Sequence, residues 1–150
     1  MLAHTGEVSV HWHAVVGALL TDPELDARLR EIVILRVAYL TGSSYERLHH
    51  EEIAARAGVP ADVIAELARA EPRPAAFNAT QNAVLALVDA LVRGHHADEG
   101  TFKAVHERVG TEVTAKLVLL IGVYVSTAVF LNAFEVDMDA GARLGVIAPT

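Results

Sequence analysis

Residues 31–50, EIVILRVAYLTGSSYERLHH, consist of a strongly apolar segment, a turn and a polar segment. The apolar part is hydrophobic on nearly every helical face, which predicts a helix buried on all sides. Thr41-Gly42 predicts the end of that helix, because glycine readily adopts the left-handed conformation that closes helices. A new helix is predicted from Ser44 onward. The junction therefore gathers carboxylates, hydroxyls and imidazoles beside a large apolar surface.

Apolar side chains recur at helical spacing along the rest of the chain, and no segment shows the alternation of a strand. Asp22-Pro23-Glu24 is typical of a helix start, with an acidic N-cap and a proline in the first turn. Glu71-Pro72-Arg73-Pro74 interrupts the pattern, but neither side has a complete core, so we expect one domain over residues 1–150. The predicted helices span residues 7–20, 22–40, 44–57, 60–70, 78–94, 99–109 and 111–134, and a loosely structured tail follows over 135–150. The fold class is all-α, a bundle of about six to seven helices.

The composition excludes several classes of function. The net charge is −7 and no basic run is present, so the chain lacks the positive surface that nucleic-acid binding requires. There are no cysteines, which excludes disulfides and thiol redox chemistry. The first residues lack the basic and apolar regions of a secretory signal, so we expect a cytoplasmic protein.

Hydrophobic residues make up 53% of the 150 residues, a high share for a short soluble chain. The longest apolar run, Leu117 to Leu131, is shorter than the roughly 18–20 residues that cross a bilayer, so no membrane span is expected. A chain of this size cannot bury every apolar helix face by itself. We therefore expect a homo-oligomer in which part of the long C-terminal helix contributes to the interface.

The junction has a purely structural interpretation. Ser43-Ser44-Tyr45-Glu46 fits the capping-box pattern, in which Ser43 accepts from the amide of Glu46 and Glu46 reaches back to the amide of Ser43. His49 and His50 would then be ordinary helix residues. This interpretation requires no catalysis.

A metal site is a second interpretation. Glu46-Arg47-Leu48-His49 matches the E-x-x-H pattern of di-iron bundles, but those need a second such pattern and further carboxylates, which this chain lacks. A site for one metal would have only the ligands of this single turn. His4, His11 and His13 are expected on solvated surface, since His11 and His13 point to different faces of a helix. We therefore expect neither a metal nor a cofactor.

Acid–base chemistry is a third interpretation. Glu46 and His50 are four residues apart, so they lie on one helix face within contact distance. A neighbouring carboxylate raises the basicity of an imidazole and fixes its orientation. Glu31, at the edge of the apolar helix, could have its proton affinity raised by burial. Two carboxylates and a histidine in different environments suffice for a general acid and a general base.

The run LREIVILRVAYLTGSSYERLHHEEIAARAGV resembles the carboxymuconolactone decarboxylase family, which includes the alkylhydroperoxidase D-like (AhpD-like) proteins. The peroxidase pattern of that family is a glutamate, then a cysteine, a second cysteine and a histidine, and its spacing falls here on Glu31, Ser43, Glu46 and His50. Both cysteine positions are changed. The segment KLVLLIGVYVSTAVFLNAFEVDMD is also similar to the C-terminal helix of the family, so the resemblance covers nearly the whole chain.

The resemblance implies an AhpD-like helical bundle that assembles as a homotrimer or hexamer. A serine with a glutamate cannot cycle between thiol and disulfide. The expected function is therefore a non-redox lyase or isomerase acting on a small carbonyl-containing acid or lactone, as in the decarboxylase branch. His50 and Glu46 would transfer protons, Glu31 would be the second acid, and Ser43 would support the developing oxyanion. Tyr45 and His49 would contact the substrate.

Two alternatives remain at this point. A non-catalytic, oligomeric binding or accessory protein on the same fold would explain the missing cysteines. A residual peroxidase role of the alkylhydroperoxidase kind is the least favoured, because its chemistry depends on the cysteine pair. A closed apolar cavity beside Glu46 and His50 would favour the enzyme, and a Glu46 folded back onto the amide of Ser43 would favour the binding protein.

Overall fold

The computed structural model describes residues 2–136, and these contain six α-helices, two short 3-10 helices and no strand. Their order is η1 Leu2–Thr5, α1 Glu7–Leu20, α2 Ala27–Thr41, α3 Ser44–Arg56, α4 Ala61–Leu67, η2 Pro74–Ala76, α5 Ala79–Gly94 and α6 Glu99–Ala133. The all-α prediction is confirmed. Apart from residues 135 and 136, the tail for which loose structure was predicted lies outside the described residues.

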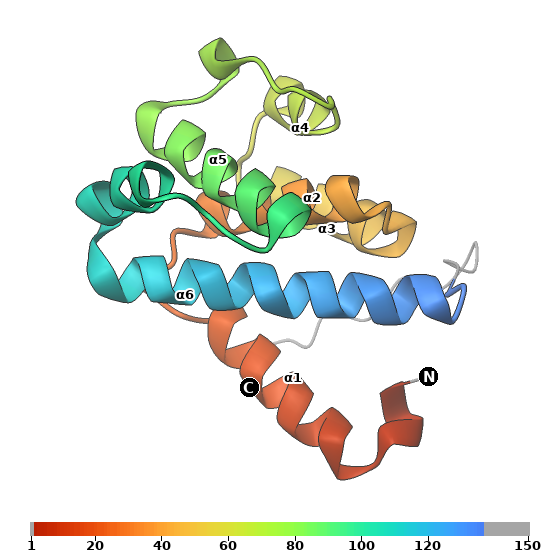
Figure 1. The fold of residues 1–150 in the computed structure, drawn as a ribbon. Coiled ribbons are helices and arrows are strands. Elements are labelled where there is room, and N and C mark those ends of the chain that lie inside the picture. The colour runs from red at the N-terminus through yellow and green to blue at the C-terminus, as the bar shows by residue number, and fades with distance from the viewer. Residues whose placement is uncertain (1, 137–150) are drawn as a thin grey trace.

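Helix α2 is the centre of the bundle. Every residue from Glu31 to Ala38 is buried, as the apolar run predicts, and the helix packs against α3, α4, α5 and α6. Figure 1 shows α6 running across the molecule, with α2, α3, α4 and α5 on one side of it and α1 on the other. Two apolar clusters share α2: one lies between α2, α5 and α6, and the other between α2, α3 and α4.

The start of helix α2 differs from the prediction. Helix α2 begins at Ala27, and its N-cap is Asp26, whose side chain accepts a hydrogen bond from the amide of Leu29 at 2.9 Å. Asp22 instead accepts from the amide of Glu24 in a preceding turn. The prediction that Asp22 caps α2 was wrong because a second aspartate four residues later can cap the helix equally well.

The predicted helices 99–109 and 111–134 are the two arms of α6. At Gly110 the backbone leaves helical geometry, with φ of 78° and ψ of 174°. A positive φ of this size strains residues other than glycine, so the glycine permits the sharp change of direction seen in Figure 1. By length and composition, α6 is the one helix in the described part of the chain that could cross a membrane, and the core helix of a soluble protein passes the same test.

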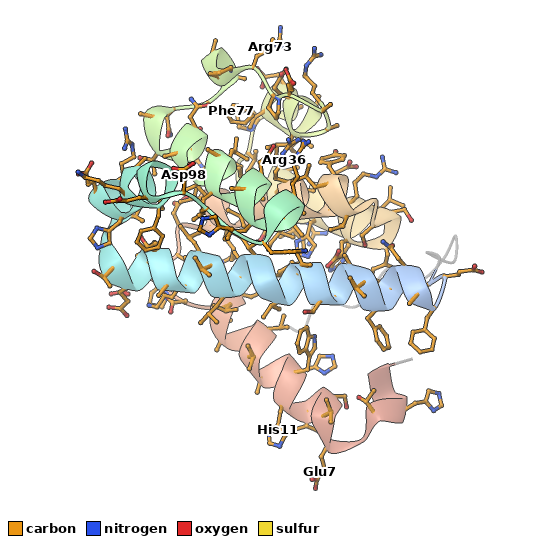
Figure 2. The ribbon with its side chains drawn as sticks, viewed as in Figure 1. Glu7, His11, Arg36, Arg73, Phe77 and Asp98 are labelled. Atoms are coloured by element: carbon orange, nitrogen blue, oxygen red, sulfur yellow. The ribbon has the colours of Figure 1, made fainter. Side chains whose placement is uncertain are left out.

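Arg36 is a buried charge with a full set of partners. Its guanidinium donates two hydrogen bonds of 2.7 Å to the carboxylate of Asp89, and others to the carbonyl oxygens of Leu67, Arg69 and Ala70. The side chain thus joins the end of α4 to α5 across α2. In Figure 2 it lies among the helices, whereas Glu7 and His11 point away from the bundle on α1. A buried charge requires partners of this kind.

Some large apolar side chains remain exposed on α1 and α6. They include Val8 and Val10 on α1, and Leu119 and Val129 on α6, each at least 60% exposed. Exposed apolar side chains of this size can contribute to an interaction surface where they adjoin one another. The oligomer predicted from the composition therefore has available surface on both helices.

Candidate functional site

The junction between α2 and α3 positions the candidate site. Gly42 takes the left-handed conformation, with φ of 67°, and the amide of Ser43 donates to the carbonyl oxygen of Ala38 at 3.0 Å. This tight connection places the first turn of α3 directly against the end of α2. As a result Ser43, Glu46 and His50 are all buried, although each is polar.

Glu31 and His50 form the central pair of the site. Nδ1 of His50 lies 2.7 Å from Oε2 of Glu31, and both side chains are buried. Oε1 of Glu31 accepts a hydrogen bond of 3.2 Å from Nε of Arg30. An imidazole that donates from Nδ1 to a carboxylate has its lone pair on Nε2, which fixes both the tautomer and the orientation. A neutral His50 that donates from Nδ1 to Glu31 therefore has its lone pair on Nε2.

No hydrogen bond joins Glu46 to His50 in the described structure. Glu46 is 3% exposed, and neither of its carboxyl oxygens has a hydrogen-bond partner among the described residues. Helical spacing places the two residues on one face, as predicted, but the packing of α3 on α2 brings His50 to Glu31 instead.

The predicted capping box at Ser43 and Glu46 is also absent. The Ser43 hydroxyl makes no capping hydrogen bond, and like the Glu46 carboxyl it is buried without a partner in the described chain. Burial raises the pKa of Glu46 to about 7. The Ser43 hydroxyl lies near the carboxyl and lowers this pKa slightly, but it does not reach hydrogen-bond geometry. Glu46 is therefore mostly protonated below pH 7, so it can donate a proton under mildly acidic conditions.

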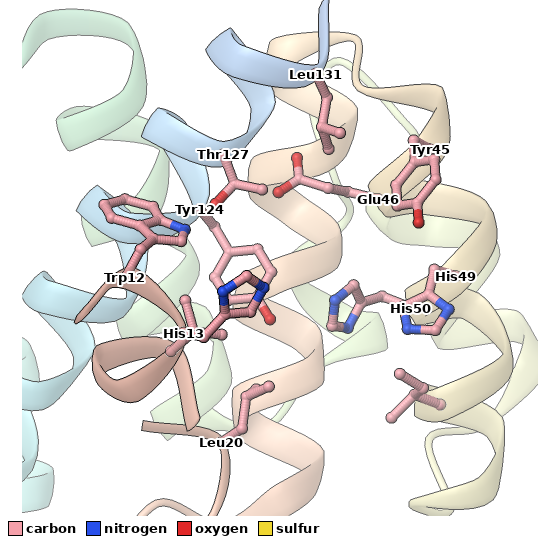
Figure 3. Close-up of a pocket in the computed structure, with 12 residues that line it drawn as sticks. Trp12, His13, Leu20, Tyr45, Glu46, His49, His50, Tyr124, Thr127 and Leu131 are labelled. Atoms are coloured by element: carbon pink, nitrogen blue, oxygen red, sulfur yellow. The ribbon is translucent and has the colours of Figure 1, made fainter. Parts of the chain in front are cut away.

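A pocket of about 270 Å³ opens beside these groups (Figure 3). Helices α1, α3 and α6 line it, and its walls are mainly apolar and aromatic. The polar groups of Glu46 and His50 lie on the α3 side, facing Trp12, His13 and Tyr124 across the pocket. An apolar pocket with a few convergent polar groups and a perturbed carboxyl is the usual form of a small-molecule site. Its lining comprises Trp12, His13, Val16, Leu20, Tyr45, Glu46, His49, His50, Ile53, Tyr124, Thr127 and Leu131.

The other predicted site residues fall into two groups. Tyr45 and His49 both line the pocket, as expected of substrate contacts. Burial lowers the pKa of His49, with a smaller contribution from the charge of His50, and burial raises the pKa of Tyr45. Glu31 and Ser43 do not line the pocket. Glu31 lies behind His50 and is in hydrogen-bond contact with its imidazole.

Tyr124 was missed as a site residue. Its ring meets the ring of His50 edge to face, with centroids 5.2 Å apart, and its pKa is raised first by burial and then by the charges of Glu31 and Glu46. The hydroxyl therefore stays protonated and can donate a hydrogen bond. The sequence did contain a signal for this residue: Tyr124 is a single phenol within a long apolar helix.

The α1 wall of the pocket was missed as well. His13, expected on solvated surface, is exposed but borders the pocket, and its Nδ1 lies 2.6 Å from the carbonyl oxygen of Ser9. Trp12 was predicted only as an apolar helix residue. Within residues 2–136, no group of three or more His, Asp or Glu side chains is arranged to hold a metal ion.

Comparison with known proteins identifies the fold and the family. A solved structure of a protein of unknown function from Agrobacterium tumefaciens, for which a role as the antioxidant defence protein AhpD has been suggested, shares the fold with a TM-score of 0.81. The two are 17% identical, and the match covers 89% of this chain and 91% of that one. No curated protein matches the chain. Residues 7–90, more than half of the sequence, match the carboxymuconolactone decarboxylase family. The chain therefore belongs to the carboxymuconolactone decarboxylase family and has an AhpD-like all-α fold without cysteines.

Proposed function

We propose that this protein is a non-redox acid–base enzyme, a lyase or isomerase that acts on a small carbonyl-containing acid or lactone. The observation that carries the proposal is the pocket itself. A histidine oriented by a buried carboxylate and a separate, unpaired carboxyl with a pKa of about 7 line the same apolar pocket. Carboxyl and imidazole groups held in different environments are the usual pair for proton transfer near neutral pH.

His50 serves as the general base. Its Nε2 removes a proton from the carbon next to the substrate carbonyl, and the C–H electron pair moves into the adjoining C–C bond as the carbonyl becomes an enolate. The resulting imidazolium is stabilised by Glu31, 2.7 Å away. Glu31 is therefore a positioning and charge-balancing residue in this scheme, rather than the second acid that its position in the sequence suggests.

Glu46 serves as the general acid. Its proton is shared with the carbonyl oxygen as negative charge develops there, and the Tyr124 hydroxyl can donate a second hydrogen bond to the same oxygen. Return of a proton to a different carbon completes an isomerisation. For a β-keto acid, loss of carbon dioxide generates the enol directly, and the same two residues then manage its protonation. Apolar walls strengthen each of these interactions because they exclude water.

The alternative of a binding or accessory protein has less support. It would be favoured by a Glu46 folded back onto the amide of Ser43 with no cavity beside it, and the described structure has the opposite arrangement in both respects. The suggested antioxidant role of the Agrobacterium protein belongs to that protein. Transfer of a thiol-based peroxidase activity would require cysteines that this chain does not contain.

The proposal is tested by screening carboxymuconolactone, related enol lactones and β-keto acids for turnover. Native protein should act on at least one of them. His50→Ala should lose that activity, while His11→Ala, at an exposed histidine of α1 that does not line this pocket, should retain it. Activity of the His50→Ala variant equal to the native level would remove the proposed base. Peroxide turnover by the native chain, without added metal or cofactor, would favour the antioxidant role instead.

We further propose that the protein self-associates as a trimer or hexamer through exposed apolar side chains such as Val10 on α1 and Leu119 and Val129 on α6. Burial of apolar surface contributes about 25 cal/mol per Å², so an interface of ordinary size strongly favours association. Leu119→Glu, which places a charge on this surface, should lower the mass measured by light scattering. A native protein that is monomeric at micromolar concentration would contradict the proposal.

A further inference from the structure

A second apolar pocket adjoins the first. It has a volume of about 210 Å³ and is lined by Thr5, Val8, Trp12, Ser126, Thr127 and Phe130. Trp12 and Thr127 line both pockets, so the two meet at this pair of residues, one on α1 and one on α6. In Figure 3 Trp12 lies across the first pocket from His49, and Thr127 lies between Trp12 and Glu46.

The two pockets differ in chemistry. The first presents Glu46, His50 and Tyr124, whereas the second has no titratable side chain in its lining and offers only hydroxyls besides apolar and aromatic groups. Small-molecule sites usually measure about 300–1,000 Å³. Each pocket alone falls below that range, and the two together fall within it. A single ligand that occupies both would need a polar head and an apolar tail.

We propose that the two pockets form one binding site for an amphipathic substrate, whose carbonyl head lies at Glu46 and His50 and whose alkyl or aryl tail passes between Trp12 and Thr127 into the second pocket. The placement of the carbonyl head rests on the proposed function. The placement of the tail is supported independently by the apolar lining of the second pocket. Trp12 and Thr127 then determine which tails can pass, and the side chains of Val8, Ser126 and Phe130 determine how long a tail can be.

The test uses Trp12 as its reporter. It is the single tryptophan in the sequence, so intrinsic fluorescence reports on the contact between the two pockets without any need for turnover. The probes are γ-butyrolactone, γ-octalactone and γ-dodecalactone, which share one neutral head and differ in the tail. Affinity should rise by roughly fourfold for each methylene that enters the second pocket, the factor expected for burial of one methylene.

Ser126→Leu should fill part of the second pocket and reduce the affinity for γ-dodecalactone at least tenfold, with little change for γ-butyrolactone. Ser126 is exposed on α6 and leucine is a good helix former, so the fold should be retained. Val8→Phe fills the same pocket from α1 and should act in the same way. The matched control is Ala115→Leu, an exposed position on α6 that lines neither pocket.

Affinity that does not depend on tail length would overturn the proposal, as would a Ser126→Leu variant that binds γ-dodecalactone as tightly as the native protein does. Failure of the enzyme proposal gives a different result. In that case tail-dependent quenching of Trp12 would persist, while no lactone or β-keto acid, long or short, would be turned over.

Discussion

Arg36 and Glu46 are both ionisable and both almost completely buried, but their surroundings differ. Arg36 donates hydrogen bonds to a carboxylate and three carbonyl oxygens, whereas the Glu46 carboxyl has no partner in the described structure. A buried charge with every donor satisfied connects parts of a fold. A buried carboxyl without a partner costs stability, and such groups are concentrated where a ligand or a proton is handled. The difference separates a structural region from a candidate active site within one small bundle.

The largest expected effect is on catalysis at the candidate active site around Glu46 and His50. His50→Ala should lower kcat/KM by about 10²–10⁴-fold on any substrate the screen identifies, because general-base catalysis contributes about that much. The measurement is steady-state kinetics, and the comparison is His49→Ala, which removes the neighbouring imidazole from the pocket wall and should lower kcat/KM less. A loss of equal size in both variants would show that the effect comes from the pocket wall and not from a base.

The next largest expected effect is on the stability that the buried Arg36 provides. Arg36→Met should lower the free energy of unfolding by about 3–5 kcal/mol, because Asp89 and the carbonyl oxygens of Leu67 and Arg69 lose the hydrogen bonds that this guanidinium donates. Among the described residues, Asp89 then keeps only its 3.4 Å pair with Arg93. Urea unfolding measures it. Arg56→Met, at an exposed pair with Glu52, should cost less than about 1 kcal/mol. Similar costs for the two arginines would contradict the role given to Arg36.

Glu46 should make stability depend on pH in the direction opposite to an ordinary paired carboxylate. Its pKa is about 7 in the folded state against a usual value of 4.5, so the folded state holds its proton more tightly than the unfolded state does. Between these values the free energy of unfolding should fall as pH rises, by up to about 3 kcal/mol in total. The loss is complete once pH exceeds the folded-state pKa.

The comparison that isolates this effect is between the native protein and Glu46→Gln, which carries no titrating group at this position. The difference between their unfolding free energies should grow in favour of the variant from about pH 5 to pH 8. A difference that stays constant over this interval would mean that Glu46 is ionised throughout, as an exposed carboxylate would be.

The smallest expected effect is on stability at Ser43, and it tests whether this serine caps α3 or has no hydrogen-bond partner. Ser43→Ala should change the free energy of unfolding by less than about 0.5 kcal/mol or stabilise the protein, because its buried hydroxyl has no partner to lose. Asn78→Ala should cost about 1 kcal/mol, since Asn78 and Gln81 form a complete capping box at the start of α5. A cost for Ser43→Ala equal to that for Asn78→Ala would restore the capping interpretation of the junction.

Most of the fold follows from local sequence patterns. The buried helix around Arg36, the left-handed Gly42 and the capping box of Asn78 were each predictable, because each depends on residues within a few positions of one another. The start of α2 was not, because Asp22 and Asp26 both fit an N-cap. Local patterns cannot choose between two equivalent signals.

The sequence predicted which residues form the candidate site better than it predicted which of them contact each other. Glu31, Glu46 and His50 do meet at one junction, but the partner of His50 is Glu31, nineteen residues away, and not Glu46. That choice depends on how α3 packs against α2. The walls formed by Trp12 and Tyr124 come from helices at opposite ends of the chain, and no spacing rule connects them.

The most direct test of the central claim is a titration of the Glu46 carboxyl by ¹³C NMR, with Glu46→Gln used to assign the signal. The account predicts a midpoint of about 7, because the group is buried beside the pocket without a hydrogen-bond partner. A midpoint near the usual value of 4.5 would contradict it. Glu46 would then be ionised at neutral pH and unable to act as the general acid.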